Sequence, residues 1–273
     1  MTATAATFDA GVAGWKEWQA APWGRLYYGV SRANVRRHVG EGPLRILDAG
    51  GGNGPDALYF AELGHSVALL DFSAHMLADA QRAAERRGVA DRISVHQADC
   101  LAIPALFPDA SFDLVLCHNV LQYVDDVGAL LAAVCAPLRP EGLLSLVVMN
   151  RHAEPYRAAF REGDLAAAYA RLAASTEVTP VFGATMRLYT ADEMIAAVEA
   201  RGCVVSGQYG VRCLADYLPD DGRKDDPAFF AHLERLEHAL TGAYPYYLLA
   251  RYVHVIARKI TADRMPARES ADA

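Results

Sequence analysis

The chain has 273 residues, of which 53% are hydrophobic and 22% charged, and its formal net charge at pH 7 is -7. This length and composition are typical of a globular protein with a substantial core and room for a cap or an insertion. The acidic balance argues weakly against a broad nucleic-acid-binding surface, although a local basic groove could exist within that sum.

The first residues lack the basic start and apolar centre of a secretion signal, and no apolar run is long enough to span a membrane. The five cysteines are scattered and include no CxxC spacing: Cys100, Cys117, Cys135, Cys203 and Cys213. We therefore expect a cytoplasmic protein with reduced, buried thiols and no metal site.

The N-terminal segment, residues 8–39, is aromatic and helical in pattern and includes Trp15, Trp18 and Trp23. It is predicted to form a helical cap, residues 1–40, over a site in the core that follows.

The first predicted strand lies within residues 44–54, where apolar residues lead to Asp48 and then to Gly50, Gly51 and Gly52. Glycines in such a strand-to-helix turn tolerate positive φ and let a ligand lie against the backbone. An acid just ahead of the glycines is unsuited to a phosphate and favours a ligand with an amino group.

A second acid, Asp71, ends the next apolar run, residues 66–70, and is followed by Phe72. A doubly wound sheet places at this position the acid that binds a ribose hydroxyl pair. An ordinary strand-to-helix turn is the alternative, but two acids in register favour a nucleoside-binding βαβ unit.

The remaining predicted elements continue the alternation of strands and helices. They are helices over 73–87, 127–138, 190–202 and 229–240, strands over 93–96, 112–117 and 143–148, a strand starting at 203 and an antiparallel last strand over 251–259. The pattern predicts a doubly wound, Rossmann-like sheet of seven strands. The core would comprise residues 41–150 and 191–262, with a helical insertion over 151–190 after the fifth strand, including a helix from 157 to 174, and a frayed tail over 263–273.

His118 directly follows the fourth predicted strand, where residues face the ligand crevice of such a sheet. It is a candidate general base near neutral pH. The alternative, that His118 only packs against the cofactor, is at least as well supported.

Residues 47–54 together with Asp71 resemble the cofactor motifs of class I S-adenosylmethionine-dependent methyltransferases. The resemblance implies S-adenosylmethionine rather than NAD as cofactor. It further implies that Asp99 accepts from the adenine amino group beside Cys100, with a loop aspartate that caps a turn as the alternative. Arg25 resembles the family arginine that reaches the methionine carboxylate, with a solvated helix arginine as the alternative.

Residues 210–218, which contain Arg212, and residues 251–259, which begin with Arg251, are similar to C-terminal signatures of the CmoM-type tRNA 5-carboxymethoxyuridine methyltransferases. The resemblance implies methylation of a carboxylate at the tRNA wobble position. A guanidinium is a natural clamp for a carboxylate or phosphate, so both arginines are candidate substrate contacts. Pairing with carboxylates such as Asp216 is the alternative.

Residues 173–185 contain no lysine, although this family carries several in the corresponding stretch, and phosphate contacts supply most nucleic-acid affinity. A carboxylate-bearing small molecule is therefore a competing methyl acceptor, on a small-molecule O- or N-methyltransferase. A non-catalytic cofactor-binding module is a third hypothesis. No obligatory protein or membrane partner is expected.

Overall fold

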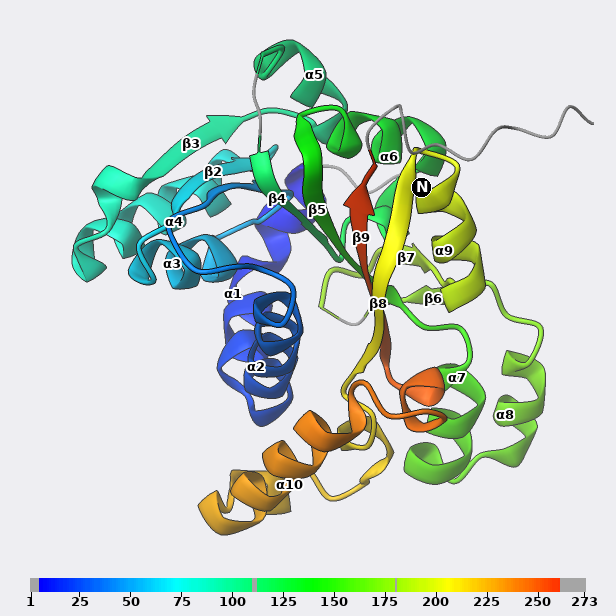
Figure 1. Cartoon of the computed structure of the whole chain (residues 1–273). Coiled ribbons are helices and arrows are strands. Elements are labelled where there is room, and N and C mark those ends of the chain that lie inside the picture. Colours follow the sequence, from blue (N-terminus) through cyan, green and yellow to red (C-terminus); the bar gives the residue numbers. More distant parts are fainter. Residues whose placement is uncertain (1–4, 110–111, 180, 261–273) are drawn as a thin grey trace, which may run out of the picture.

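The computed structural model describes residues 5–109, 112–179 and 181–260, so the predicted tail over 263–273 lies outside the described residues. Its main feature is a seven-stranded sheet with the order β3-β2-β1-β4-β5-β9-β8 (Figure 1). The strands are β1 (Arg45–Ala49), β2 (Ser66–Asp71), β3 (Ile93–Gln97), β4 (Phe112–His118), β5 (Leu138–Met149), β8 (Cys203–Val211) and β9 (Tyr252–Lys259). The first five are parallel, and β9 is antiparallel to both β5 and β8. The predicted doubly wound fold is confirmed.

Helices cover both faces of the sheet, which explains why inner strands such as β2 and β4 are buried along almost their whole length. On one face, Leu47 packs in a cluster with residues of α6 (Val127–Cys135) and α9 (Ala191–Glu199). On the other, Ile46 packs with residues of α3 (Pro55–Glu62) and α4 (Ala74–Arg87). Successive residues of a strand point to opposite faces, so one short strand serves two cores. A short helix, α5 (Ile103–Leu106), follows β3.

The strand order reverses between β1 and β4. From β1 the chain continues to β2 and β3 on one side, and from β4 it continues to β5 on the other. Ligands of doubly wound sheets bind in the crevice at this switch point, outside the carboxyl ends of the strands. The glycine loop after β1, the acid ending β2 and His118 ending β4 therefore converge at one edge.

Helices α1 (Ala5–Ala20) and α2 (Pro22–Arg36) form the N-terminal segment. Phe8 of α1 packs on Phe72 after β2 (5.4 Å between ring centroids), on Tyr123 after β4 (5.1 Å) and on Phe182 (4.7 Å). These contacts place α1 across the loops at the carboxyl edge of the sheet.

The insertion after β5 differs from the single helix predicted over 157–174, which was wrong. It contains α7 (Ala153–Arg157), a π-helical turn (Ala158–Glu162), α8 (Leu165–Arg171) and a hairpin of β6 (Thr176–Val178) and β7 (Thr185–Arg187). The helix is interrupted because Gly163 adopts φ +69° and the Asp164 side chain caps α8 by accepting from Ala167 N (2.8 Å).

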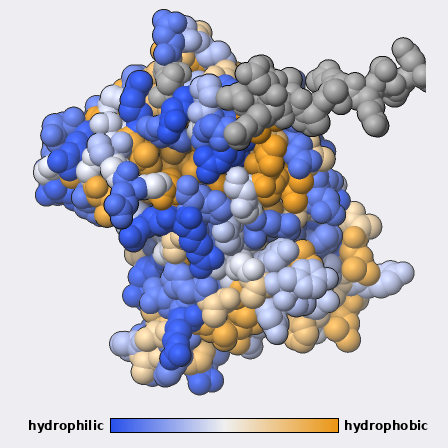
Figure 2. Space-filling view, viewed as in Figure 1, coloured by the Kyte–Doolittle hydropathy of each residue, from blue (hydrophilic) through white to orange (hydrophobic). Residues whose placement is uncertain are grey.

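The C-terminal part adds α10 (Pro227–Leu240), which contacts α2 and lies beyond the end of the sheet in Figure 1. Short 3-10 turns lie at Ala215–Tyr217, Gly222–Asp225 and Tyr246–Leu249. All five cysteines are free, four of them buried and Cys100 half-buried. In the view of Figure 2, hydrophilic side chains predominate over the α3–α4 side. No helix among the described residues is long and apolar enough to cross a membrane.

Candidate active site

A cavity of about 710 Å³ lies at the switch point and extends under α1 and the insertion toward the segment after β8. Every predicted site residue except Arg25 lines it. These residues are Asp48, Gly50, Gly51, Gly52, Asp71, Phe72, Asp99, Cys100, His118, Arg212 and Arg251. Two sets of residues, predicted separately as cofactor and substrate contacts, thus share one cavity.

The glycine loop is held against β2 by Gly50 N and Gly51 N, which donate to Leu70 O at 2.8 and 3.2 Å. Gly50 has φ +73°, a conformation that L side chains rarely adopt. A Cβ on Gly51 would lie 2.4 Å from Asp48 Cγ and 2.5 Å from Leu69 Cδ1. The loop therefore requires glycine where it passes the buried Asp48.

Replacing Gly51 with alanine should abolish cofactor binding, because the new Cβ must displace either the Asp48 carboxylate or the loop itself. Gly40→Ala is the matched control, since a Cβ there meets nothing within 4 Å. Isothermal titration with S-adenosylhomocysteine checks this. Equal affinities in both variants would contradict the proposed loop geometry.

Asp71 ties two segments of the loop region together. Its Oδ2 accepts from Gly52 N and its Oδ1 from Ser73 N, both at 2.9 Å. Burial raises the pKa of the Asp71 carboxyl group, and these backbone donors oppose the rise. The carboxylate is thus fixed at the cavity wall.

Asp48 is buried, and its Oδ2 has no hydrogen-bond partner among the described residues. Burial, reinforced by Asp56 and Asp71, raises the pKa of the Asp48 carboxyl group well above its usual value. An unpaired buried carboxylate is costly unless a cation approaches it. A ligand with an ammonium group would supply that missing partner.

Asp99 and Cys100 lie further along the cavity, after β3. Asp99 Oδ1 accepts from Leu101 N (2.8 Å) and so caps a short 3-10 helix, as the alternative to adenine binding had anticipated. Burial, followed by the charges of Asp71 and Asp99, raises the pKa of the Cys100 thiol to about 12. A raised pKa favours the thiol over the thiolate at neutral pH, so the geometry supports Cys100 as a residue of the cavity wall.

Arg25 is not brought to this cavity. Its face of α2 is exposed, whereas Leu26 and Tyr27 next to it are buried, and its guanidinium lies 4.1 Å from the Phe230 ring centroid. It lines a separate surface hollow. The assignment of Arg25 to the cofactor is not supported by this geometry.

His118 belongs to a buried polar network. Its Nδ1 lies 3.2 Å from Asp56 Oδ2 and its Nε2 lies 2.8 Å from Ser145 Oγ, which in turn lies 2.9 Å from His254 Nε2. Burial alone would raise the pKa of Asp56, but Arg32 and His118 hold it at about 2. With both ring nitrogens engaged, the geometry favours His118 as a packed cavity residue over the general base that was also considered.

His254 gives the network a pH dependence. Burial, followed by the neighbouring His118 and His38, lowers the pKa of His254 well below its usual value. The unfolded chain, with a pKa of about 6.5, therefore takes up the proton first as the pH falls. Stability should decrease by about 1.4 kcal/mol per pH unit below about pH 6.5, until the folded-state pKa is reached.

Urea unfolding of wild type and His254→Gln between pH 7.5 and 5.5 measures this dependence. The variant should be less stable at pH 7.5 but show a flatter profile, whereas the exposed His232→Gln should keep the wild-type slope. Parallel profiles for all three proteins would be inconsistent with a neutral, buried His254.

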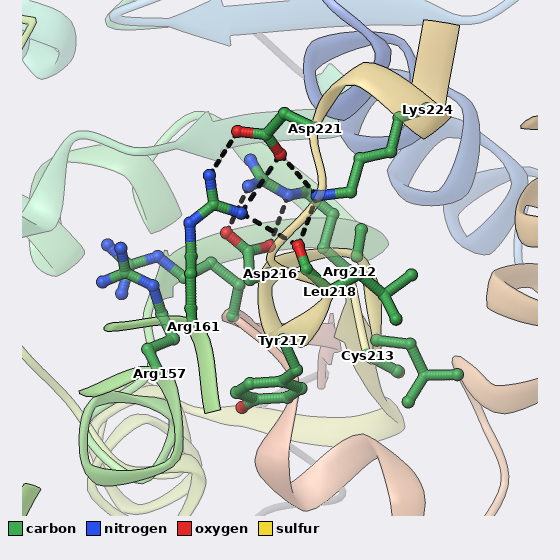
Figure 3. Close-up of polar contacts among 12 residues, drawn as sticks. Arg157, Arg161, Arg212, Cys213, Asp216, Tyr217, Leu218, Asp221 and Lys224 are labelled. Carbon is green, nitrogen blue, oxygen red and sulfur yellow. Dashed lines mark hydrogen bonds and ion pairs between the residues drawn. The ribbon is translucent and has the colours of Figure 1, made fainter. Parts of the chain in front are cut away.

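Arg212 lies in the other half of the cavity and is already paired. It is buried, donates from Nε to Asp216 Oδ2 (2.7 Å) and forms a second bond to Asp216 Oδ1 (Figure 3). Its guanidinium carbon lies 5.7 Å from the Trp18 ring and 5.6 Å from the Tyr252 ring. The anticipated alternative, a pair with Asp216, is therefore present within the cavity wall.

Arg251 is similarly buried and forms ion pairs with Glu154 and with Glu177, the latter at 2.9 Å from Nη2 to Oε2. Arg157 Nη1 bridges the same two acids at 3.0 and 3.2 Å. Burial lowers the pKa of Arg251 to about 10.

The lining residues that sequence reasoning missed include Arg157, Arg161, Asp221 and Lys224. They come from the insertion and from the loop before α10. In Figure 3, Arg161, Asp221 and Lys224 lie beside Arg212, whereas the Arg157 side chain extends away from them. A cluster of basic residues at 157 and 161, one helical turn apart, was the available signal.

The cavity is divided by charge. Four carboxylates line the half that contains the glycine loop, namely Asp48, Asp56, Asp71 and Asp99. Of these, Asp56 is paired with Arg32. The basic lining residues lie in the other half and are Arg157, Arg161, Arg212, Lys224 and Arg251. Three carboxylates, Glu177, Asp216 and Asp221, line this half as well, so five cationic side chains face three anionic ones there. No group of three or more His, Cys, Asp or Glu side chains in the described part of the chain is placed to hold a metal ion.

Comparison with known proteins agrees with this arrangement. Residues 47–146 match the model of a methyltransferase domain family. A solved S-adenosylmethionine-dependent methyltransferase from Mesorhizobium loti has a TM-score of 0.58 and 24% identity, covering 84% of this chain and 97% of that one. Another, from Thermotoga maritima, has a TM-score of 0.62 and 15% identity, covering 94% and 100%. These two likenesses establish the fold.

The chain belongs to the class I S-adenosylmethionine-dependent methyltransferases. A relative similar over nearly its full length is the tRNA 5-carboxymethoxyuridine methyltransferase of Escherichia coli K12. The two are 32% identical over 255 residues, which cover 88% of this chain and 94% of the relative. The similarity therefore extends well beyond residues 47–146, which match the family model.

Proposed function

We propose that the enzyme transfers a methyl group from S-adenosylmethionine to the carboxylate of 5-carboxymethoxyuridine at the wobble position of cytoplasmic tRNA. The observation that carries the proposal is the division of one cavity into an acidic and a basic half. The donor is a cation with an ammonium group, and a carboxylate acceptor is an anion, so each fits one half. The similarity to the tRNA enzyme of E. coli supports the same acceptor.

In the acidic half, Asp48 Oδ2 would accept from the cofactor ammonium and Asp71 from the ribose hydroxyls. Asp99 would accept from the adenine amino group, while Phe72 and Cys100 form the surrounding wall. The ligand can lie against the backbone of the glycine loop because the glycines carry no side chains. The bound cofactor supplies a methyl group activated by the positive sulfur.

In the basic half, the residues position an acceptor that needs no deprotonation, since a carboxylate is already ionised at neutral pH. Arg212 and Arg251 would orient the carboxylate, and the internal ion pairs keep each guanidinium fixed. Trp18 and Tyr252 hold the Arg212 guanidinium by cation–π contacts. The packed Phe8 of α1 excludes water from the transfer.

Purified enzyme, labelled S-adenosylmethionine and tRNA that carries unmethylated 5-carboxymethoxyuridine test the acceptor. We expect label in tRNA and a binding affinity that falls steeply with salt. Label appearing in a metabolite pool and not in tRNA would favour the small-molecule acceptor, which the lysine-free stretch 173–185 and the net charge of -7 keep as the second candidate.

A further inference from the structure

The ionic groups that form the basic half of the cavity fall into three clusters, and their formal charges differ. Arg212 is balanced by Asp216. Arg157 and Arg251 are balanced by Glu154 and Glu177. In the third cluster, two cations, Arg161 and Lys224, share the single carboxylate of Asp221.

Lys224 is the more unusual member of the third cluster, because it is only 1% exposed. Its ammonium donates to Asp221 Oδ1 (2.6 Å) and to Leu218 O (2.9 Å). Arg161 Nη1 donates to the same two oxygens, at 3.1 and 3.2 Å (Figure 3). An ammonium has three N–H groups, and the described residues accept only two from Lys224.

A buried cation whose charge is incompletely neutralised is costly in the free protein, and an anion from solution would offset that cost. Both Lys224 and Arg161 line the cavity, so an acceptor can reach them. Arg212, by contrast, already faces Asp216, and Arg251 faces Glu154 and Glu177. These ion pairs reduce the attraction that the two arginines exert on a further anion.

We propose that Lys224 and Arg161, held together by Asp221, form the anion-binding subsite for the methyl acceptor. The proposal rests on the proposed function in assuming an anionic acceptor, which is either the reacting carboxylate or a phosphate of the same nucleotide. In this proposal, the net attraction for the anion comes from Lys224 and Arg161, which lie outside the C-terminal segments 210–218 and 251–259. Arg212 and Arg251 then act on the orientation of the acceptor more than on its affinity.

Thermal-shift titrations with acetate and with inorganic phosphate test the subsite, with S-adenosylhomocysteine saturating the acidic half and chloride matching the ionic strength. The melting temperature of the wild type should rise saturably with at least one anion. Lys224→Met should weaken the apparent affinity at least about tenfold, a change of about 1.4 kcal/mol, and Lys224→Arg should largely restore it. Arg223→Met, an exposed neighbour that lies over Phe229, should behave as wild type.

Asp221→Asn separates a binding role from a structural one. Removal of its negative charge raises the formal excess of the cluster from one to two positive charges, so anion affinity should increase. If the cluster were purely structural, Asp221→Asn would lose anion affinity as Lys224→Met does, and that result would overturn the proposal. It would also be overturned if acetate and phosphate raised the melting temperature of the wild type no more than chloride does. Saturation by acetate identifies the carboxylate as the bound group, and saturation by phosphate alone identifies the phosphate.

The result of these anion titrations can be distinguished from the result of the tRNA methylation assay. Suppose that tRNA accepts no methyl group, but that anions still stabilise the wild type, with affinity lower in Lys224→Met and higher in Asp221→Asn. The subsite then stands, and only the proposed acceptor is wrong. If tRNA is methylated and the anion response is absent, the subsite is wrong and the proposed function stands.

Discussion

Asp71→Ala is expected to abolish binding of S-adenosylmethionine and S-adenosylhomocysteine. The carboxylate that would hold both ribose hydroxyls is lost, and so are the acceptors for Gly52 N and Ser73 N. Two hydrogen bonds to a charged group are together worth about 3 kcal/mol or more, so affinity should fall at least about 100-fold. Isothermal titration measures the effect.

The matched control is Asp91→Ala, which removes an exposed acid from the turn before β3 and should leave affinity unchanged. Asp71→Asn retains the side-chain shape but offers one oxygen acceptor in place of two. An intermediate affinity is expected for it. Tight binding by Asp71→Ala, in protein that unfolds cooperatively, would remove the basis for placing the ribose at β2.

Arg251→Met should both destabilise the fold and suppress methyl transfer. Without Arg251, the buried Glu154 and the half-buried Glu177 are left with Arg157 alone. Breaking the buried pair with Glu154 in this way costs about 3–5 kcal/mol. Urea unfolding and kcat/KM for the acceptor are the measurements.

The double variant Arg251→Met with Glu177→Gln distinguishes stability from acceptor orientation. It restores the charge balance of the cluster, so most of the lost stability should return, while transfer remains at least about tenfold reduced. Cofactor affinity should be unchanged in both variants, because the cluster lies in the basic half. Full recovery of transfer together with stability would mean that Arg251 serves the fold alone.

The grouping of residues in the acidic half of the cavity could be predicted because its determinants are local in the chain. Asp48 and the three glycines lie within residues 48–52, and Asp71 ends the next strand, so the topology of a doubly wound sheet suffices to bring them together. The antiparallel last strand was likewise evident from its alternation and was confirmed.

The buried network and the basic half depend on tertiary contacts that no local pattern encodes. Ser145 and His254 read as ordinary strand residues, yet they meet His118 across β5 and decide the environment of its ring. Lys224 and Arg161 are 63 positions apart and lie in no motif. For Arg25, the pattern predicted a helix but not which face of it would meet the cavity.

The interruption of the insertion helix is a different case, because a signal was present. Gly163 followed by Asp164 is a helix stop followed by a helix cap, and reading the two together predicts two helices where one was expected.

The central claim is that a cationic methyl donor and an anionic carboxylate meet in one cavity, which makes the product a methyl ester. The most direct measurement is the alkali lability of label transferred from S-adenosylmethionine to tRNA. Mild base should release the label as volatile methanol. Label that stays on the tRNA under these conditions would show transfer to nitrogen, carbon or a hydroxyl, and would contradict the account.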